Sequence, residues 1–115
     1  MMDFEELMTA LRKGQLKDGS HVELSGVMAI GELNRIYVSE QDAESKSEAH
    51  LTIANAAAVE GALMDSVPPY GGGNYLFHDN ATVSGTLETT GTNVSLLLNS
   101  VVVHRGSDSY KVRID

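Results

Sequence analysis

The chain has 115 residues, with 16 acids against 8 lysines and arginines, and contains neither cysteine nor tryptophan. This length fits one domain, which buries roughly 65% of its unfolded surface and needs no metal or disulfide to hold a core. The formal net charge of −8 argues against a general nucleic-acid binder, because neutralising phosphates requires a basic surface. The lack of cysteine excludes disulfides, thiolate catalysis and Cys-ligated metal centres.

The excess of acid is confined to the first part of the chain. Residues 1–80 hold 13 acids and 5 bases, whereas residues 81–115 hold 3 of each. One face or end of the fold is therefore expected to be acidic. No apolar run approaches the roughly 18 residues of a membrane span. The acidic start of the chain does not resemble a secretory signal, so we expect a cytoplasmic protein, unless a targeting segment has been removed.

Residues 1–14 are predicted to form a short helix. Asp3 is its expected N-cap, Glu6 completes a capping box, and Gly14 ends the helix. The apolar stripe at helical spacing consists of Phe4, Leu7, Met8 and Leu11.

After this helix the apolar period changes from 3.6 to 2, which predicts strands. The predicted strands are residues 21–30, 35–39, 50–54, 81–89, 94–104 and 110–114. The polar residues 40–49 are predicted to form a mobile loop, and residues 75–77 a short apolar piece before the fourth strand. The inward pattern must pass from Leu98 to Val101, which predicts a bulge near Asn99–Ser100.

Asn55 is predicted to cap a second helix over residues 56–64. The glycine run 71–73 follows, but it lacks the lysine and hydroxyl residues of a phosphate-binding loop. We interpret that run as a hinge or tight connection.

Residues 20–105 resemble the OB-fold, a five-stranded Greek-key barrel with a helix between its third and fourth strands. The matching features are Gly26 inside a long first strand, the helix at 56–64, and Gly85 inside the fourth strand. The resemblance implies a mainly β, closed five-stranded barrel in a single domain, to which the first helix and the last strand (residues 110–114) are additions. It also implies a ligand face on strands two and three, used in this superfamily for single-stranded nucleic acids, oligosaccharides or proteins.

On that face, strand alternation is expected to turn Tyr37 and its neighbours outward if Ile36 and Leu51 point inward. The outward set would be Arg35, Tyr37, Ser39, His50 and Thr52. One tyrosine makes a thin stacking platform, because base stacking is worth roughly 1–3 kcal/mol per aromatic. The acids at 40–48 would also repel phosphates, so binding of a single-stranded nucleic acid or an oligosaccharide is the alternative interpretation.

Metal and catalytic motifs are absent from the sequence. The four histidines are scattered, and no serine lies in a nucleophile-elbow pattern. The acids Asp42, Glu44 and Glu48 leave weak binding of a divalent ion as an alternative to a solvated loop.

We therefore expect a non-enzymatic domain without a cofactor, acting by protein–protein contact with a basic partner in an inhibitor, immunity-type or subunit role. The oligomeric state stays open. The predicted contact surface consists of Arg35, Tyr37, Glu40, Asp42, Glu44, His50 and Thr52.

Overall fold

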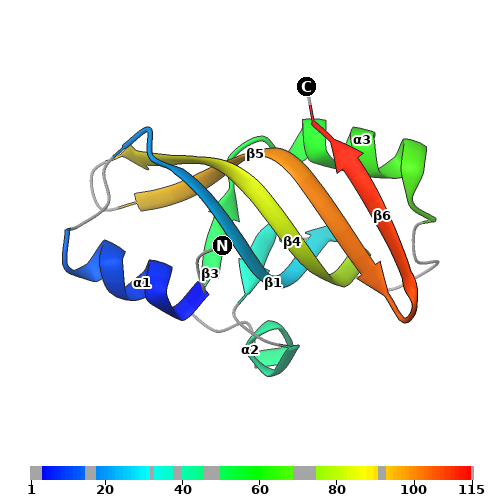
Figure 1. Ribbon diagram of the computed structural model, residues 1–115, viewed down its shortest axis with the longest axis horizontal. Coiled ribbons are helices and arrows are strands. Elements are labelled where there is room, and N and C mark those ends of the chain that lie inside the picture. The colour runs from blue at the N-terminus through cyan, green and yellow to red at the C-terminus, as the bar shows by residue number, and fades with distance from the viewer. Residues whose placement is uncertain are drawn as a thin grey trace.

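Strands make up most of the chain (Figure 1). The computed structural model describes residues 4–14, 18–31, 33–37, 40–45, 50–68, 75–90 and 93–114. In chain order the elements are α1 (Phe4–Arg12), β1 (His21–Gly31), β2 (Arg35–Tyr37), α2 (Glu40–Ser45), β3 (His50–Ile53), α3 (Ala56–Ser66), β4 (Tyr75–Thr90), β5 (Asn93–Arg105) and β6 (Asp108–Arg113).

Five of these strands close into a barrel. The sheet order is β3-β2-β1-β4-β5-β6, and a parallel pairing of β3 with β5 joins the two ends of the five-stranded part. The predicted mainly β, closed five-stranded barrel with a helix between its third and fourth strands is confirmed. β5 pairs with β3 near its start and with β6 along its C-terminal half, and both partners lie on the same edge of β5.

The predicted bulge lies at Asn99. Ser84 pairs with Ser100 and Gly85 with Leu98, which leaves Asn99 as the extra residue of β5. Gly85 is required there, because a Cβ atom on it would overlap the carbonyl oxygen of Leu97. A glycine inside this strand is thus explained by the close approach of a neighbouring backbone.

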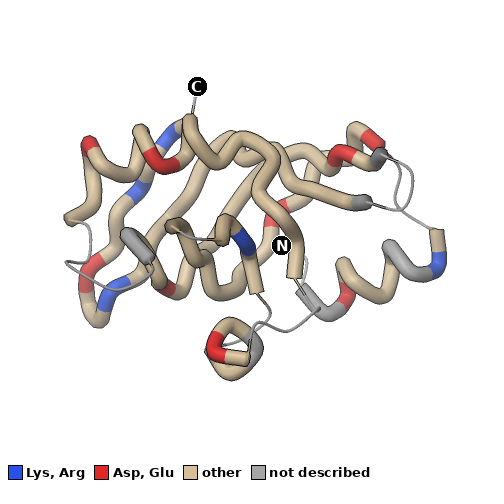
Figure 2. The backbone as a smooth tube through the Cα atoms, turned by 180° about the vertical axis from the view of Figure 1, so that it is seen from behind, with Lys and Arg blue, Asp and Glu red and all other residues tan. Residues whose placement is uncertain are grey.

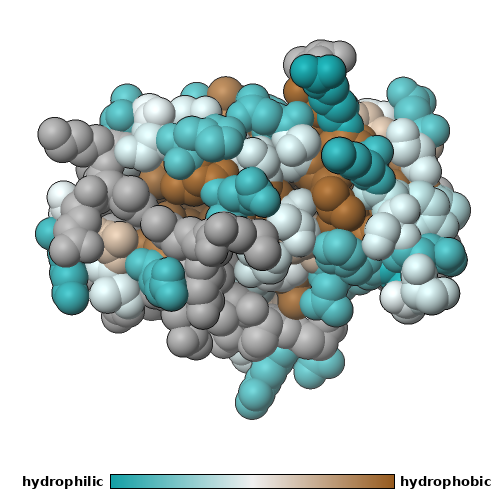
Figure 3. All heavy atoms as spheres, in the orientation of Figure 1, coloured by the Kyte–Doolittle hydropathy of each residue, from teal (hydrophilic) through white to brown (hydrophobic). Residues whose placement is uncertain are grey.

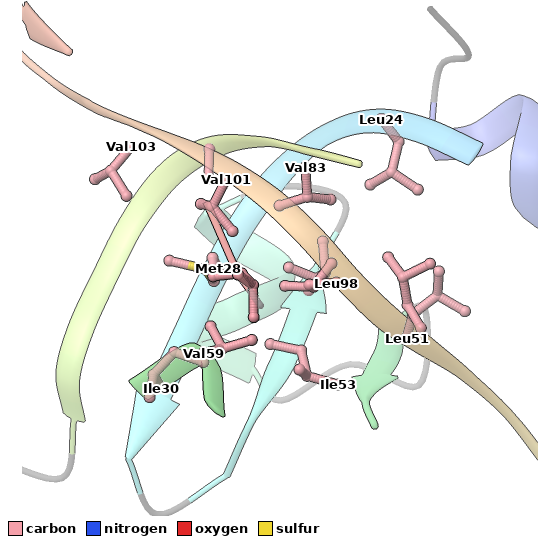
Figure 4. Packing of buried hydrophobic residues seen from close by; sticks show 14 of the residues in the cluster. Leu24, Met28, Ile30, Leu51, Ile53, Val59, Val83, Leu98, Val101 and Val103 are labelled. Carbon is pink, nitrogen blue, oxygen red and sulfur yellow. The ribbon is translucent and has the colours of Figure 1, made fainter. Parts of the chain in front are cut away.

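Apolar side chains of the strands fill the barrel, and helices cover its two ends. Figure 4 shows Leu24, Met28, Val83, Leu98 and Val101 pointing into one shared interior. Leu7 of α1 belongs to the same cluster and is fully buried. Val59 and Leu63 of α3, the helix between β3 and β4, are also buried in this cluster. The predicted end of α1 is confirmed by Gly14, whose φ is 69°, whereas its predicted cap at Asp3 lies outside the described residues.

Asn55 does not act as the predicted cap. Its side chain makes no cap hydrogen bond to α3. The Asn55 Nδ2 instead donates to the Leu98 carbonyl, and its Oδ1 accepts from the Leu98 N–H. The preceding residue in the chain, Ala54, donates its N–H to the Leu96 carbonyl. A side-chain amide carries the same donor and acceptor as a peptide group, so Asn55 extends the short β3–β5 ladder.

Two further sequence predictions of local structure are wrong. Residues 75–77 are continuous with β4 rather than a separate piece. The stretch predicted as a loop contains the helix α2 over Glu40–Ser45. Residues 38–39 of the predicted second strand and the glycine run 71–73 lie outside the described residues.

One buried ion pair fastens the chain after α3 to the barrel. Arg105 Nε and Nη2 donate to the two carboxylate oxygens of Asp79, at 2.8 and 3.0 Å. Arg105 Nη1 donates to the Pro68 carbonyl at 2.6 Å. The Asp79 side chain is 3% exposed, so this fork-shaped arrangement supplies the hydrogen bonds that a buried carboxylate needs.

Candidate functional site

The predicted contact residues on β2 and β3 lie side by side. Tyr37 pairs with His50 and Arg35 with Thr52 across the two antiparallel strands. Ile36, Leu51 and Ile53 point into the barrel core. The opposite side chains therefore project from the barrel, as strand alternation predicts.

The expectation that Tyr37 belongs to an exposed contact surface is wrong. Its side chain is fully buried, in a second cluster with Val27, Ala29 and Ala43 that is separate from the barrel core. Ala43 comes from α2, which packs on β1 and β2 and covers them from outside. Tyr37 thus points away from the barrel interior, but a helix covers it there.

The neighbours of Tyr37 complete a compact patch. Arg35 Nη1 donates to the Tyr37 hydroxyl at 3.2 Å. The His50 ring lies 5.5 Å from the Tyr37 ring between centroids, tilted by 53°. Arg35 and His50 are half-buried, and Thr52 is exposed. A phenol ring, a guanidinium and an imidazole therefore meet on β2 and β3, and we call Arg35, Tyr37 and His50 the β2–β3 patch.

The three predicted acids lie on α2 rather than in a mobile loop. Glu44 is exposed, while the side chains of Glu40 and Asp42 lie outside the described residues. The helix has no basic residue in its last turn. Figure 2 shows acidic segments on α2 and on α3, seen from behind.

Few contacts hold α2 in place. A helix of six residues is too short to be stable alone in water. Among the described side chains of α2, Ala43 is the one that belongs to the Tyr37 cluster. Burying its one methyl group contributes only about 1 kcal/mol. The acids are therefore fixed on the barrel by a small contact.

A row of hydroxyl and imidazole groups on the outer sheet face escaped the sequence analysis. His21 Nε2 and Ser84 Oγ are 3.0 Å apart. A second chain of hydrogen bonds crosses four strands through Ser25, Thr82, His104 and Ser109. The register of β1, β4, β5 and β6 brings them together, whereas their alternate spacing in sequence gave only a weak signal.

This polar row lies on an open surface. Figure 3 shows the face over β4, β5 and β6 as mainly pale and teal, with brown areas between. The hydrogen bonds of the row lie at exposed positions, where water competes for the same groups. The arrangement therefore suits hydrogen bonding to a partner and lacks the enclosure that activates a catalytic nucleophile.

A hollow of about 440 Å³ lies between α3 and β6. Asp65 lines it from the helix, and Lys111 and Arg113 line it from the strand. Its charges are mixed and these side chains are exposed, so it gives no clear preference for one ligand.

Metal binding finds no support in the described ranges. There, no three histidine, aspartate or glutamate side chains gather closely enough to hold an ion. Of the acids considered for a divalent ion, Glu48 lies outside those ranges.

The chain matches no protein-family model, no curated protein and no solved structure. Among the helices that the structure describes, none has the length and apolar character of a membrane span.

Proposed function

We propose that this chain is a non-enzymatic binding domain on an OB-like barrel, acting by contact with a basic protein. The surface for this contact is α2 together with the exposed rim of β2 and β3. The role that fits is that of an inhibitor, an immunity-type protein or a subunit of a larger assembly.

The position of α2 is the observation that supports this proposal most. Three acids in six residues belong to a helix that packs on the barrel, although the polar sequence of this stretch predicts a mobile loop. Placing charges on a folded element reduces the entropy lost on binding, and complementary charge increases the association rate. The burial of Tyr37 also argues against base stacking while α2 is docked.

The test compares two charge-reversed variants of the same net charge. Glu40→Lys/Asp42→Lys/Glu44→Lys changes α2, and Asp65→Lys/Glu88→Lys/Asp108→Lys changes exposed acids elsewhere. The partner recovered by co-purification is titrated with each variant in a calorimeter at two salt concentrations.

We expect the α2 variant to bind at least about tenfold more weakly, with a reduced dependence on salt. The control variant should keep most of the affinity. Equal losses in the two variants would show that only the total charge matters, and unchanged affinity in the α2 variant would remove this surface from consideration.

A further inference from the structure

We propose that the edge of β6 that faces away from β5 binds an extended segment of a partner protein, which joins the sheet as an added strand. The segment that fits alternates acidic and apolar residues. This surface is separate from α2, so the two proposals can fail independently.

β6 presents a row of backbone hydrogen-bonding groups at its outer edge. The strand pairs with β5 on one side, and among the described strands none pairs with its other side. The Ile114 N–H donates to the Asn99 carbonyl of β5 at 2.8 Å. Because alternate residues of an antiparallel strand bond to the same neighbour, the N–H and C=O groups of Ser109, Lys111 and Arg113 point to the outer edge. Such a row is a template for another extended chain.

Two hollows flank the C-terminal part of this edge. One, of about 440 Å³, lies between β6 and α3, which packs against it (Figure 1). The other, of about 360 Å³, lies beside Ser100 of β5, and Lys111, Val112 and Arg113 line both hollows. Ser100 lies opposite Arg113, so the second hollow is on the outer face, whereas Val112 points into the core that α3 shares. An added strand therefore directs alternate side chains to the two hollows.

The two faces of the edge differ in chemistry, although the mixed charges of the α3 hollow do not by themselves select a ligand. Lys111 and Arg113 are exposed on the outer face, and neither makes an ion pair with a described residue. They attract acidic side chains at the facing positions of an added strand. On the other face, Asp65 repels an acid. The helix wall there includes three small residues that leave room for apolar side chains, namely Ala58, Gly61 and Ala62.

The probe is a fluorescein-labelled peptide of about seven residues in which glutamate and valine alternate. Its binding is measured by fluorescence anisotropy at about 0.15 M salt, because a Debye length of about 8 Å then screens the distant acids of this chain. Lys111→Glu changes the edge, and Lys13→Glu, at an exposed position just after α1, is the control of equal net charge. We expect Lys111→Glu to bind about tenfold or more weakly, and Lys13→Glu to match the parent protein.

Methylation of the peptide backbone distinguishes strand addition from attraction between charges alone. Alternate amides of an extended chain point to opposite edges, so one peptide is N-methylated at its glutamates and another at its valines. One of the two should lose binding and the other should keep it.

Equal binding of the two methylated peptides would overturn the proposal, as would tighter binding of a peptide that alternates lysine and valine. Failure of the parent protein to bind the probe would show that Lys111 and Arg113 only protect the edge from pairing, and would overturn it too. Sedimentation of the chain alone gives a further test. A dimer that Lys111→Glu dissociates would assign the edge to a second copy instead of an acidic segment.

Discussion

The side-chain amide of Asn55 makes two hydrogen bonds with the backbone of Leu98, each 2.9 Å long. They continue the ladder in which Thr52 and Ile53 pair with Ser95 and Leu96. Because few backbone pairs connect β3 to β5, one side chain supplies a substantial share of the barrel closure.

We expect Asn55→Ala to lower the free energy of unfolding by about 1–3 kcal/mol, since the N–H and C=O of Leu98 lose their partners in a half-buried site. Urea unfolding followed by circular dichroism measures this loss. Asn80→Ala, at an exposed position of β4, is the control and should change stability by less than about 0.5 kcal/mol. Similar values for the two variants would contradict the role of Asn55 in closure.

Two glycine-to-alanine substitutions should act in opposite directions. Gly85→Ala places a methyl group against the Leu97 carbonyl oxygen, and we expect a loss of about 1–3 kcal/mol. Gly61→Ala lies in α3 with open space around the new Cβ, and the better helix propensity should add about 0.5–1 kcal/mol. Thermal unfolding of both proteins in one buffer compares them directly, and a stable Gly85→Ala protein would show that β5 can move away.

The Asp79–Arg105 pair should be sensitive to removal of its cation. Arg105→Ala leaves the Asp79 carboxylate, which is 3% exposed, without these hydrogen bonds, and we expect a loss of about 3 kcal/mol. Arg105→Lys retains the charge but not the two-pronged geometry, so it should recover only part of that loss. Arg113→Ala serves as the reference at an exposed position. Full recovery of the parent stability by Arg105→Lys would show that the forked geometry is unimportant.

Substitutions of Tyr37 test whether its side chain is buried, because the loss of stability depends on that burial. Because its ring is fully buried, Tyr37→Ala should cost about 3–5 kcal/mol. Tyr37→Phe removes only the hydrogen bond from Arg35 and should cost about 1 kcal/mol. Guanidinium chloride titrations distinguish these values. An exposed tyrosine would give small losses in both variants.

The barrel could be predicted from the sequence because apolar residues recur at every second position over long parts of its strands, as at Val22 and Leu24 of β1. The inward positions of β5 change from Leu98 to Val101, and this shift alone located the bulge. The start of β4 was missed because Asp79 occupies an inward position between Phe77 and Ala81, and its partner Arg105 is distant in sequence. A charged residue at such a position interrupts the apolar pattern that predicts a strand.

The candidate site was predicted less well than the fold. The direction of the Tyr37 side chain follows from alternation, but its burial involves α2, whose member of the cluster, among the side chains that the structure describes, is the small residue Ala43. A single alanine among polar residues gives no helical periodicity, so contact with the sheet could not be predicted. Asn55 was assigned to a cap because capping is a local pattern, whereas its actual partner is Leu98.

The extra residue at Asn99 also sets the tolerance of the chain to changes in length. On one side of it the even-numbered residues Leu96 and Leu98 face the interior, and on the other side the odd-numbered residues Val101 and Val103 do. Inserting or deleting one residue elsewhere in β5 would exchange its inner and outer faces over the rest of the strand. Deletion of Asn99 itself would force the same exchange on the half that pairs with β6. The length of β5 is therefore fixed to the residue.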